Sequence, residues 1–156
     1  MIFQNNLETE IEILKSNDID KLDELISVFA NVFEMENFKR PGEAHLAKIL
    51  KNDNFIAVVA KKEDKIIAGL TVYLIDQYYS DRPLAYVYDL AVLTEYQRKG
   101  VGKKLIEFTN EYCRQKGFEE LFVQVDKVDN HAIDFYRLTK PTREEQVIHF
   151  SYALTK

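Results

Sequence analysis

The sequence is poor in the features that mark secreted, membrane or multidomain proteins. It has one cysteine, Cys113, so no internal disulfide can form and a cytoplasmic location is expected. No apolar run is long enough to span a bilayer, and residues 1–12 lack the basic and apolar regions of a secretory signal. The three prolines and five glycines are too scattered to mark a linker. These absences predict a single domain over residues 1–156 with no membrane role.

Basic residues are also fewer than acidic residues. The chain has 21 Lys and Arg against 26 Asp and Glu, a net charge of −5, which disfavours nucleic-acid partners and suits cationic substrates. His45, His131 and His149 have no metal-ligand spacing with each other or with Cys113, so no metal site is expected. Cys113 itself is expected to be an inert, half-buried thiol on a helix.

Hydrophobic periodicity predicts an α/β protein with a mixed sheet. The first helix would be capped by Asn17 or Asp18, and the second would carry Pro41 in its first turn. A polar turn at 62–65 predicts an antiparallel hairpin. The predicted strands are 10–14, 55–60, 66–75, 85–92, 121–125 and 147–154, and the predicted helices are 19–33, 41–52, 101–116 and 130–137.

The most informative segment is Gln97-Arg98-Lys99-Gly100-Val101-Gly102, which joins an apolar strand to an amphipathic helix. The first amides of such a helix are unpaired and point out of its N-terminus, where the helix dipole favours an anion such as a pyrophosphate. The two glycines let the backbone and a phosphate approach without an intervening Cβ.

Two common phosphate-binding motifs do not fit this segment. A P-loop needs a glycine where Gln97 stands and a Ser or Thr where Lys104 stands. A dinucleotide fingerprint needs a third glycine at position 105, which is Leu105, and a strand that opens its βαβ unit. The remaining pattern, Gln/Arg-x-x-Gly-x-Gly/Ala after a strand, resembles the acetyl-CoA loop of the GCN5-related N-acetyltransferase superfamily.

Further segments narrow the resemblance to the aminoglycoside 3-N-acetyltransferases of the gentamicin type. They are Tyr88-Asp89-Leu90-Ala91-Val92, Val123-Gln124-Val125-Asp126, Arg143-Glu144-Glu145 and His149-Phe150, with weaker likeness at Val32-Phe33-Glu34 and Asn54-Phe55-Ile56-Ala57. The chain departs from that family at Leu138-Thr139-Lys140-Pro141, where the family usually has Leu-Gly. This departure changes how the helix predicted at 130–137 ends, and a different end could alter the substrate side of the site.

The resemblance implies acetyl-CoA as cosubstrate and an α/β fold with helices on both faces of a mixed central sheet, in which two parallel strands splay apart at the acetyl-CoA site. The pantetheine arm would pair with the exposed strand, and a free amide of Leu90 or Ala91 would polarise the thioester carbonyl. The basic side chains around the loop, Lys104 among them, would reach the phosphates, while Asn130 either caps its helix or contacts the cofactor. The implied cofactor-binding residues are Leu90, Ala91, Val92, Gln97, Arg98, Lys99, Gly100, Val101, Gly102, Lys103 and Asn130.

Acyl transfer to an amine needs a base for the amine and an acid for the thiolate. Asp89 lies in an apolar strand, where desolvation would raise its pKa to a value useful for a base, although it could instead hydrogen-bond a tyrosine or a loop amide. Tyr136, on the short helix where the superfamily carries a tyrosine, is the expected acid, with side-chain packing as the alternative.

The acceptor is expected to be an aminoglycoside or a similar cationic amine, recognised by carboxylates. The expected substrate-binding residues are Glu34, Glu36, Asp126, Asp129, Glu144 and Glu145. A polyamine, a protein N-terminal amine, or an acyl-CoA sensor without turnover remain alternatives. Pairing of two chains through the last strand is a further expectation from the resemblance.

Overall fold

The structure, a computed structural model, describes residues 8–155. Residues 1–7, which are part of the stretch expected to carry no secretory signal, lie outside the described residues. The chain divides into two compact units, one ending at Gln124 and the other beginning at Val125.

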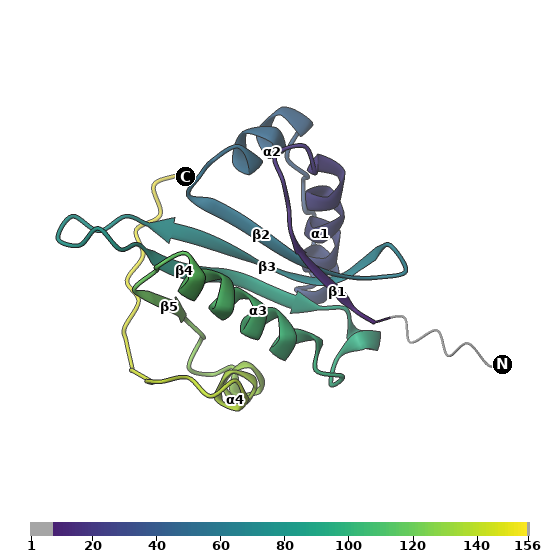
Figure 1. The fold of residues 1–156 in the computed structure, drawn as a ribbon. Coiled ribbons are helices and arrows are strands. Elements are labelled where there is room, and N and C mark those ends of the chain that lie inside the picture. The colour runs from purple at the N-terminus through teal and green to yellow at the C-terminus, as the bar shows by residue number, and fades with distance from the viewer. Residues whose placement is uncertain (1–7, 156) are drawn as a thin grey trace. The chain divides into compact units, whose positions relative to one another are not determined.

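A mixed five-stranded sheet forms the centre of the first unit (Figure 1). The strands follow one another in sequence order across the sheet, and all neighbours are antiparallel except β4 and β5, which are parallel. The elements of the first unit are β1 (Glu10–Ile13), α1 (Ile19–Val32), α2 (Glu43–Leu50), β2 (Phe55–Lys62), β3 (Lys65–Ile75), β4 (Leu84–Val92), the 3-10 turn η1 (Thr94–Tyr96), α3 (Val101–Gln115) and β5 (Glu120–Val123). The second unit contains α4 (Asn130–Leu138).

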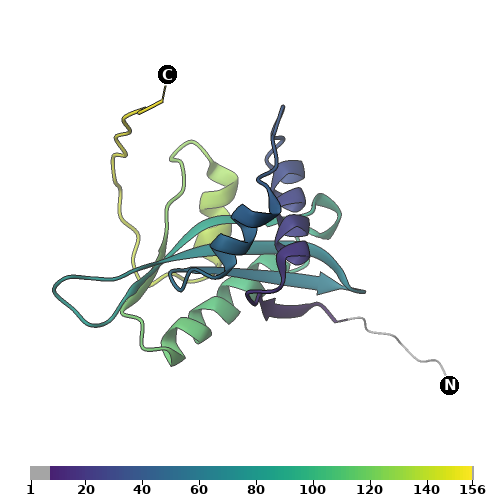
Figure 2. The same ribbon diagram turned by 90° about the horizontal axis from the view of Figure 1, so that it is seen from above.

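Helices cover both faces of the sheet, as the resemblance implies. The buried stripe of α1, which includes Leu22, Leu25 and Phe29, packs with Ala57 and Ala91 of the sheet in one core cluster. On the opposite face α3 contacts β2, β3 and β4 (Figures 1 and 2). The periodicity of the two helices places their apolar residues on the sheet side because positions three and four apart share one helix face.

Cys113 is more deeply buried in α3 than expected, with 4% of its surface exposed. Burial raises the pKa of its thiol to about 11. A thiol that stays protonated is a poor nucleophile, so the expected inert role fits this environment.

The hairpin between β2 and β3 turns on Glu63 and Asp64, both with positive φ, as a two-residue turn requires. The second helix begins later than predicted. Gly42 is its N-cap, with φ −70° and ψ 160°, so Pro41 lies before the helix and not in its first turn. Because the backbone at Gly42 is extended, the helix cannot continue back to Pro41.

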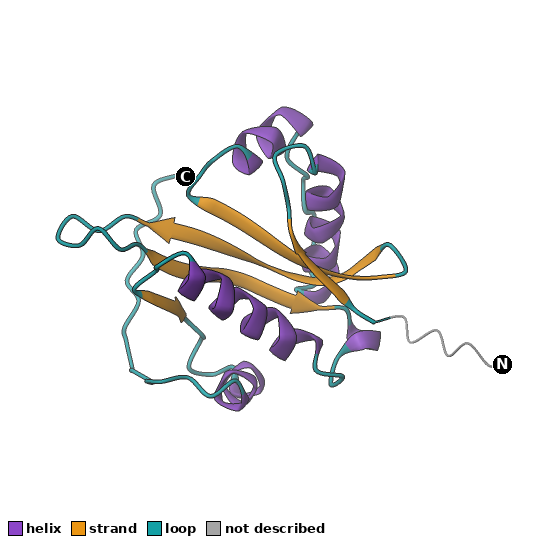
Figure 3. Cartoon of the chain, in the orientation of Figure 1, coloured by secondary structure: helices purple, strands orange, loops and turns teal. Residues whose placement is uncertain are grey.

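The prediction of a strand at 147–154 is wrong for the single chain. Residues 140–155 form neither helix nor strand (Figure 3). The alternation of apolar residues is present, but a strand also needs a neighbour that accepts its backbone hydrogen bonds. Between 64% and 93% of the surface is exposed for Val147, Ile148, Phe150, Tyr152 and Leu154.

Gly69 in β3 lies directly against the Leu25 side chain of α1. A Cβ at this position would lie 2.8 Å from the backbone oxygen of Val58 and would overlap the Leu25 side chain. We expect Gly69→Ala to destabilise the protein by about 1–3 kcal/mol, as overpacked cores generally do. Urea unfolding measures the effect, and Gly42→Ala, where nothing lies within 4 Å, is the matched control. Equal stability of the two variants would contradict this view of the α1 contact.

Candidate active site

The glycine loop places unpaired amides at the end of β4. Gly100 is the N-cap of α3 in the left-handed region, with φ 81°, and no side chain caps the helix. The first helical bond runs from the Lys104 amide to the Gly100 carbonyl, 3.0 Å, so the preceding amides of the first turn point outward. The side chain of Gln97 donates to the Val92 carbonyl at 2.9 Å and ties the loop to the end of β4.

Lysines gather beside this loop. The ammonium groups of Lys62, Lys65 and Lys99 each lie 5.9 Å from the centre of the Tyr96 ring. Lys62, Lys99 and Lys104, with Glu8 as the one carboxylate among the described lining residues, line a hollow of about 220 Å³ next to Val101. Unpaired amides with nearby ammonium groups are the surroundings that a pyrophosphate requires, so the loop fits the anionic end of coenzyme A. Lys62 was missed in the sequence because it is far from the loop along the chain.

Lys103 and Arg98 differ in their surroundings from the lysines of that hollow. The Lys103 ammonium lies 3.8 Å from the Glu107 carboxylate along the exposed side of α3. Arg98 is exposed and has a positive φ of 59°. Both remain available to an anion, since a surface ion pair of this kind contributes little stability.

The pairing of β4 with β5 stops halfway along β4, which leaves the rest of that edge open, as the resemblance implies. Their pairing ends at Val87 and Val123, while β4 continues to Val92 with β3 on its other side. The Leu93 amide donates to the Ile67 carbonyl of β3 at 2.9 Å. Because successive amides of a strand point to opposite sides, the Ala91 amide also faces β3, while the amides of Leu90 and Val92 face the open edge. Of the two expected donors, only Leu90 therefore faces that edge.

A β-bulge lies beside this opening. Asp89 pairs with Thr71 and Val87 pairs with Val72, which leaves Tyr88 as an extra residue on β4. Bulges change the direction of neighbouring side chains and are common next to active sites. The bulge was not predicted from the sequence, because apolar alternation does not show where one residue is inserted.

Asp89 is half-buried, on the same face as Ala91, whose side chain is buried in the α1 cluster. Burial raises the pKa of its carboxyl above the ordinary range. Within residues 8–155 the carboxylate has no hydrogen bond or ion pair. The structural alternative, a hydrogen bond to a tyrosine or a loop amide, is therefore not realised, and the carboxylate can accept a proton.

In the second unit, Asp129 and not Asn130 caps α4. The Asp129 side chain accepts from the Ala132 amide at 3.0 Å, and Asn130 is the first helical residue. The capping role considered for Asn130 is thus wrong, because the short aspartate side chain already reaches the first turn. Tyr136 is half-buried on this helix, with its ring 4.9 Å from that of Phe135 in an edge-on contact.

The expected substrate carboxylates fall into two groups. Glu34 and Glu36 are exposed just after α1 in the first unit. Those of the second unit already have partners. Glu144 accepts two hydrogen bonds from Arg137, at 2.7 and 3.1 Å, which lower the pKa of its carboxyl. Glu145 pairs with Arg143 at 2.9 Å, Asp129 caps α4, and Asp126 accepts from the Val128 amide at 3.1 Å.

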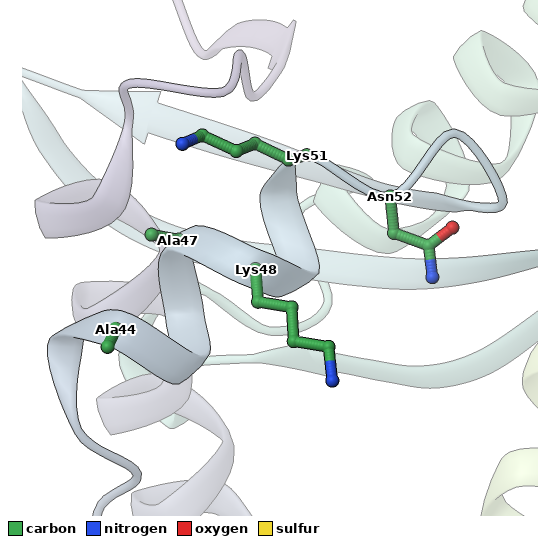
Figure 4. A pocket seen from close by; sticks show the side chains of 5 residues that line it. All are labelled: Ala44, Ala47, Lys48, Lys51 and Asn52. Atoms are coloured by element: carbon green, nitrogen blue, oxygen red, sulfur yellow. The ribbon is translucent and has the colours of Figure 1, made fainter.

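A second hollow, of about 600 Å³, lies beside α2 (Figure 4). Its lining consists of Ala44, Ala47, Lys48, Lys51 and Asn52. The two lysines extend in different directions from the helix. Positive charge without a carboxylate repels a cationic amine, so this hollow is unsuited to the acceptor.

Comparison with known proteins assigns a family to this fold and site. Residues 20–139 match the model of the acetyltransferase (GNAT) family. A crystal structure of the aminoglycoside acetyltransferase meta-AAC0020 from an uncultured soil metagenomic sample, in complex with trehalose, is 56% identical. It covers 97% of this chain and 99% of its own, with a TM-score of 0.93. A comparison with curated proteins finds no match.

Two more solved structures are similar. The sisomicin complex of meta-AAC0020 is also 56% identical, with a TM-score of 0.93 over 94% of this chain and 97% of that chain. The aminoglycoside acetyltransferase HMB0005, also from an uncultured soil metagenomic sample, is 31% identical, with a TM-score of 0.87 over 95% and 99%.

The chain belongs to the acetyltransferase (GNAT) family and is an acetyl-CoA-dependent N-acetyltransferase. None of the helices within residues 8–155 is long and apolar enough to cross a membrane.

Proposed function

We propose that this enzyme transfers the acetyl group of acetyl-CoA to an amine of an aminoglycoside. The observation that carries the proposal is Asp89, an unpaired, half-buried carboxylate beside the open edge of β4. Similarity to meta-AAC0020, whose complex with sisomicin is known, supports the acceptor class. The 3-amino group is the proposed position, supported by the sequence resemblance to the gentamicin-type enzymes.

In the proposed reaction the amine nitrogen attacks the thioester carbonyl, a C–N bond forms and the C–S bond breaks. Asp89 accepts the proton of the attacking amine, and its raised pKa brings its basicity closer to that task. The Leu90 amide donates a hydrogen bond to the carbonyl oxygen as negative charge develops there. Tyr136 is the proposed acid that protonates the coenzyme A thiolate. The amides of the first turn of α3 hold the pyrophosphate.

Glu34 and Glu36 are the proposed contacts for the ammonium groups of the acceptor. Both are exposed in the first unit, and their negative charge suits a polycation. The second-unit carboxylates stay in the proposal, but each would have to give up or share an existing hydrogen bond or ion pair. That cost makes Asp126, Asp129, Glu144 and Glu145 weaker contacts than the first two.

An acceptor screen tests this function. Purified protein with acetyl-CoA is incubated with aminoglycosides, a linear polyamine or a peptide with a free N-terminus, and thiol release is measured. We expect release with aminoglycosides, and NMR of the product identifies the acetylated nitrogen. Thiol release only with the polyamine or the peptide would mean that this compound, and not an aminoglycoside, is the acceptor. Thermal protection by acetyl-CoA without thiol release from any amine would point to a sensor.

We also propose that both units act as one acetyltransferase domain and that two chains pair through residues 147–154. The family match at 20–139 crosses the boundary between the units and supports the first proposal. The second is supported by the exposed apolar residues of this segment, since a strand added from another chain would cover them.

The pairing makes a prediction about mass in solution. Ile148, Phe150 and Tyr152 would share one face of an extended strand, so burying this face depends on all three. We expect light scattering to give twice the chain mass for the wild type and the chain mass for Phe150→Asp. Ser151→Asp, on the other face, is the control that should remain a dimer. A monomeric wild type at micromolar concentration would exclude the pairing.

A further inference from the structure

Five aromatic rings form a continuous row across four strands of the sheet. The row, called here the aromatic row, consists of Phe55 in β2, Tyr73 in β3, Tyr86 and Tyr88 in β4, and Phe122 in β5. Neighbouring ring centres lie 4.8–5.9 Å apart along it. Phe122 and Tyr86 are stacked at 8°, whereas Tyr88 meets both Tyr86 and Tyr73 edge to face.

The row shares its sheet face with Asp89. Thr71 pairs with Asp89, and Tyr73, two residues further along β3, points to the same face because side chains alternate. Tyr88 would point to the opposite face in a regular strand, but it is the extra residue of the bulge, and its ring contacts Tyr73. Tyr88 and Asp89 are neighbours in the sequence, and because of the bulge their side chains also point to the same face of the sheet.

The two central rings are open to the outside. Tyr73 is 41% exposed and Tyr88 is 59% exposed, although both are large rings in the middle of the sheet. Burial, followed by electrostatic interaction with Tyr88 and Asp89, raises the pKa of the Tyr73 hydroxyl. Tyr73 thus keeps a neutral, flat face next to the carboxylate, and this site lies entirely within the first unit.

We propose that Tyr73 and Tyr88 form the floor of the acceptor site, where an amino-sugar ring stacks and presents its ammonium group to Asp89. This inference rests on the proposed function and adds to it the residues that select a ring. The apolar C–H face of a sugar ring covers a flat aromatic side chain well, and an ammonium group is attracted to its π face. A linear polyamine offers charge but no flat face of this size.

The row also explains how a shallow, exposed surface can orient its substrate. Carboxylates such as Glu34 attract any polycation but do not fix its orientation, because a screened surface ion pair has little directional preference. Stacking limits a ring to positions parallel to the tyrosine faces. Acceptor geometry at Asp89 therefore depends on the rings, while attraction depends on the charges.

The test compares Tyr73→Leu and Tyr88→Leu with Tyr78→Leu. Leucine keeps an apolar side chain but removes the flat face. Tyr78, 97% exposed in the loop between β3 and β4, is the matched control. For each variant, kcat and KM are measured with sisomicin, and the binding of sisomicin and of a linear polyamine is measured by calorimetry.

We expect KM and Kd for sisomicin to rise about tenfold in Tyr88→Leu and Tyr73→Leu and kcat to fall, because the amine is less well oriented at Asp89, while the KM for acetyl-CoA stays nearly unchanged. The Kd for the polyamine should not change, and Tyr78→Leu should match the wild type. Turnover with unchanged sisomicin KM in both variants would overturn the aromatic floor and leave the proposed function standing. Binding that depends on the rings without turnover would overturn the function and keep the floor. A wild type that neither binds nor acetylates sisomicin would overturn both.

Discussion

Replacing Asp89 by asparagine is expected to lower kcat by about 10²- to 10⁴-fold, the range typical for loss of a general base. The amide has nearly the same shape as the carboxyl but cannot accept a proton from the attacking amine. Acetyl-CoA affinity should stay within about twofold, since the α3 loop is untouched. Steady-state kinetics and calorimetry measure the two quantities. Asp81→Asn, at an exposed position of the β3–β4 loop, is the control.

The pH profile separates a base from a residue that only positions the substrate. Because burial raises the pKa of Asp89, the wild-type kcat/KM should fall as pH drops through that raised pKa and the carboxylate becomes protonated. The acidic limb should disappear from the residual activity of Asp89→Asn. An unchanged kcat, or an acidic limb that survives in the variant, would contradict the assigned role.

The same substitution makes a prediction about stability. The pKa of Asp89 is higher in the folded protein than in the unfolded chain, so the folded state binds its proton more tightly. The protonated carboxyl favours folding at low pH, and this contribution is lost as pH rises through the folded pKa. Asp89→Asn should therefore melt at a higher temperature than the wild type at neutral pH. The difference should vanish below the ordinary pKa of aspartate.

The sequence predicts most of the sheet and the strand–loop–helix geometry before α3 well because both depend on local patterns. The apolar stripes of α1 and α3 and the turn at Glu63 and Asp64 follow from spacing and turn chemistry within a few residues. Gly100, just before α3, has a positive φ. Glycine adopts positive φ with a lower steric cost than any other residue type, so its place in the sequence predicts this turn.

The features that were missed depend on contacts between distant parts of the chain. Tyr88 points toward Tyr73 only because β4 carries an extra residue, and Lys62 reaches the α3 loop only through the β2–β3 hairpin. The strand expected at 147–154 failed for the same reason. Apolar alternation identifies a face that can be buried, but it does not identify the partner that buries it.

The carboxylates show a related limit. From sequence, all six acidic residues were equivalent candidates for binding an amine. The structure distinguishes Glu34 and Glu36, which are exposed, from Glu144, which is held by two hydrogen bonds from Arg137. Charge type can be taken from a sequence, whereas the availability of the charge depends on which partner already holds it.

Gly100→Glu is expected to weaken acetyl-CoA binding at least about a hundredfold. A carboxylate within about 4 Å of a phosphate costs several kcal/mol at an intermediate effective dielectric, and each 1.4 kcal/mol is about a tenfold change in Kd. The side chain would also stand where the α3 amides face the pyrophosphate. Calorimetry with coenzyme A measures the loss, and it needs no acceptor and no turnover.

The control for this experiment is at the other end of the same helix. Gly117 follows α3 with φ +80°, and a Cβ there, as at Gly100, has nothing within 4 Å. Gly117→Glu therefore introduces the same charge and comparable backbone strain, about 1–2 kcal/mol, without an anion site beside it. Equal loss of folding stability in the two variants, with loss of binding only in Gly100→Glu, would locate the pyrophosphate at the start of α3. Normal binding by Gly100→Glu would mean that coenzyme A is held elsewhere.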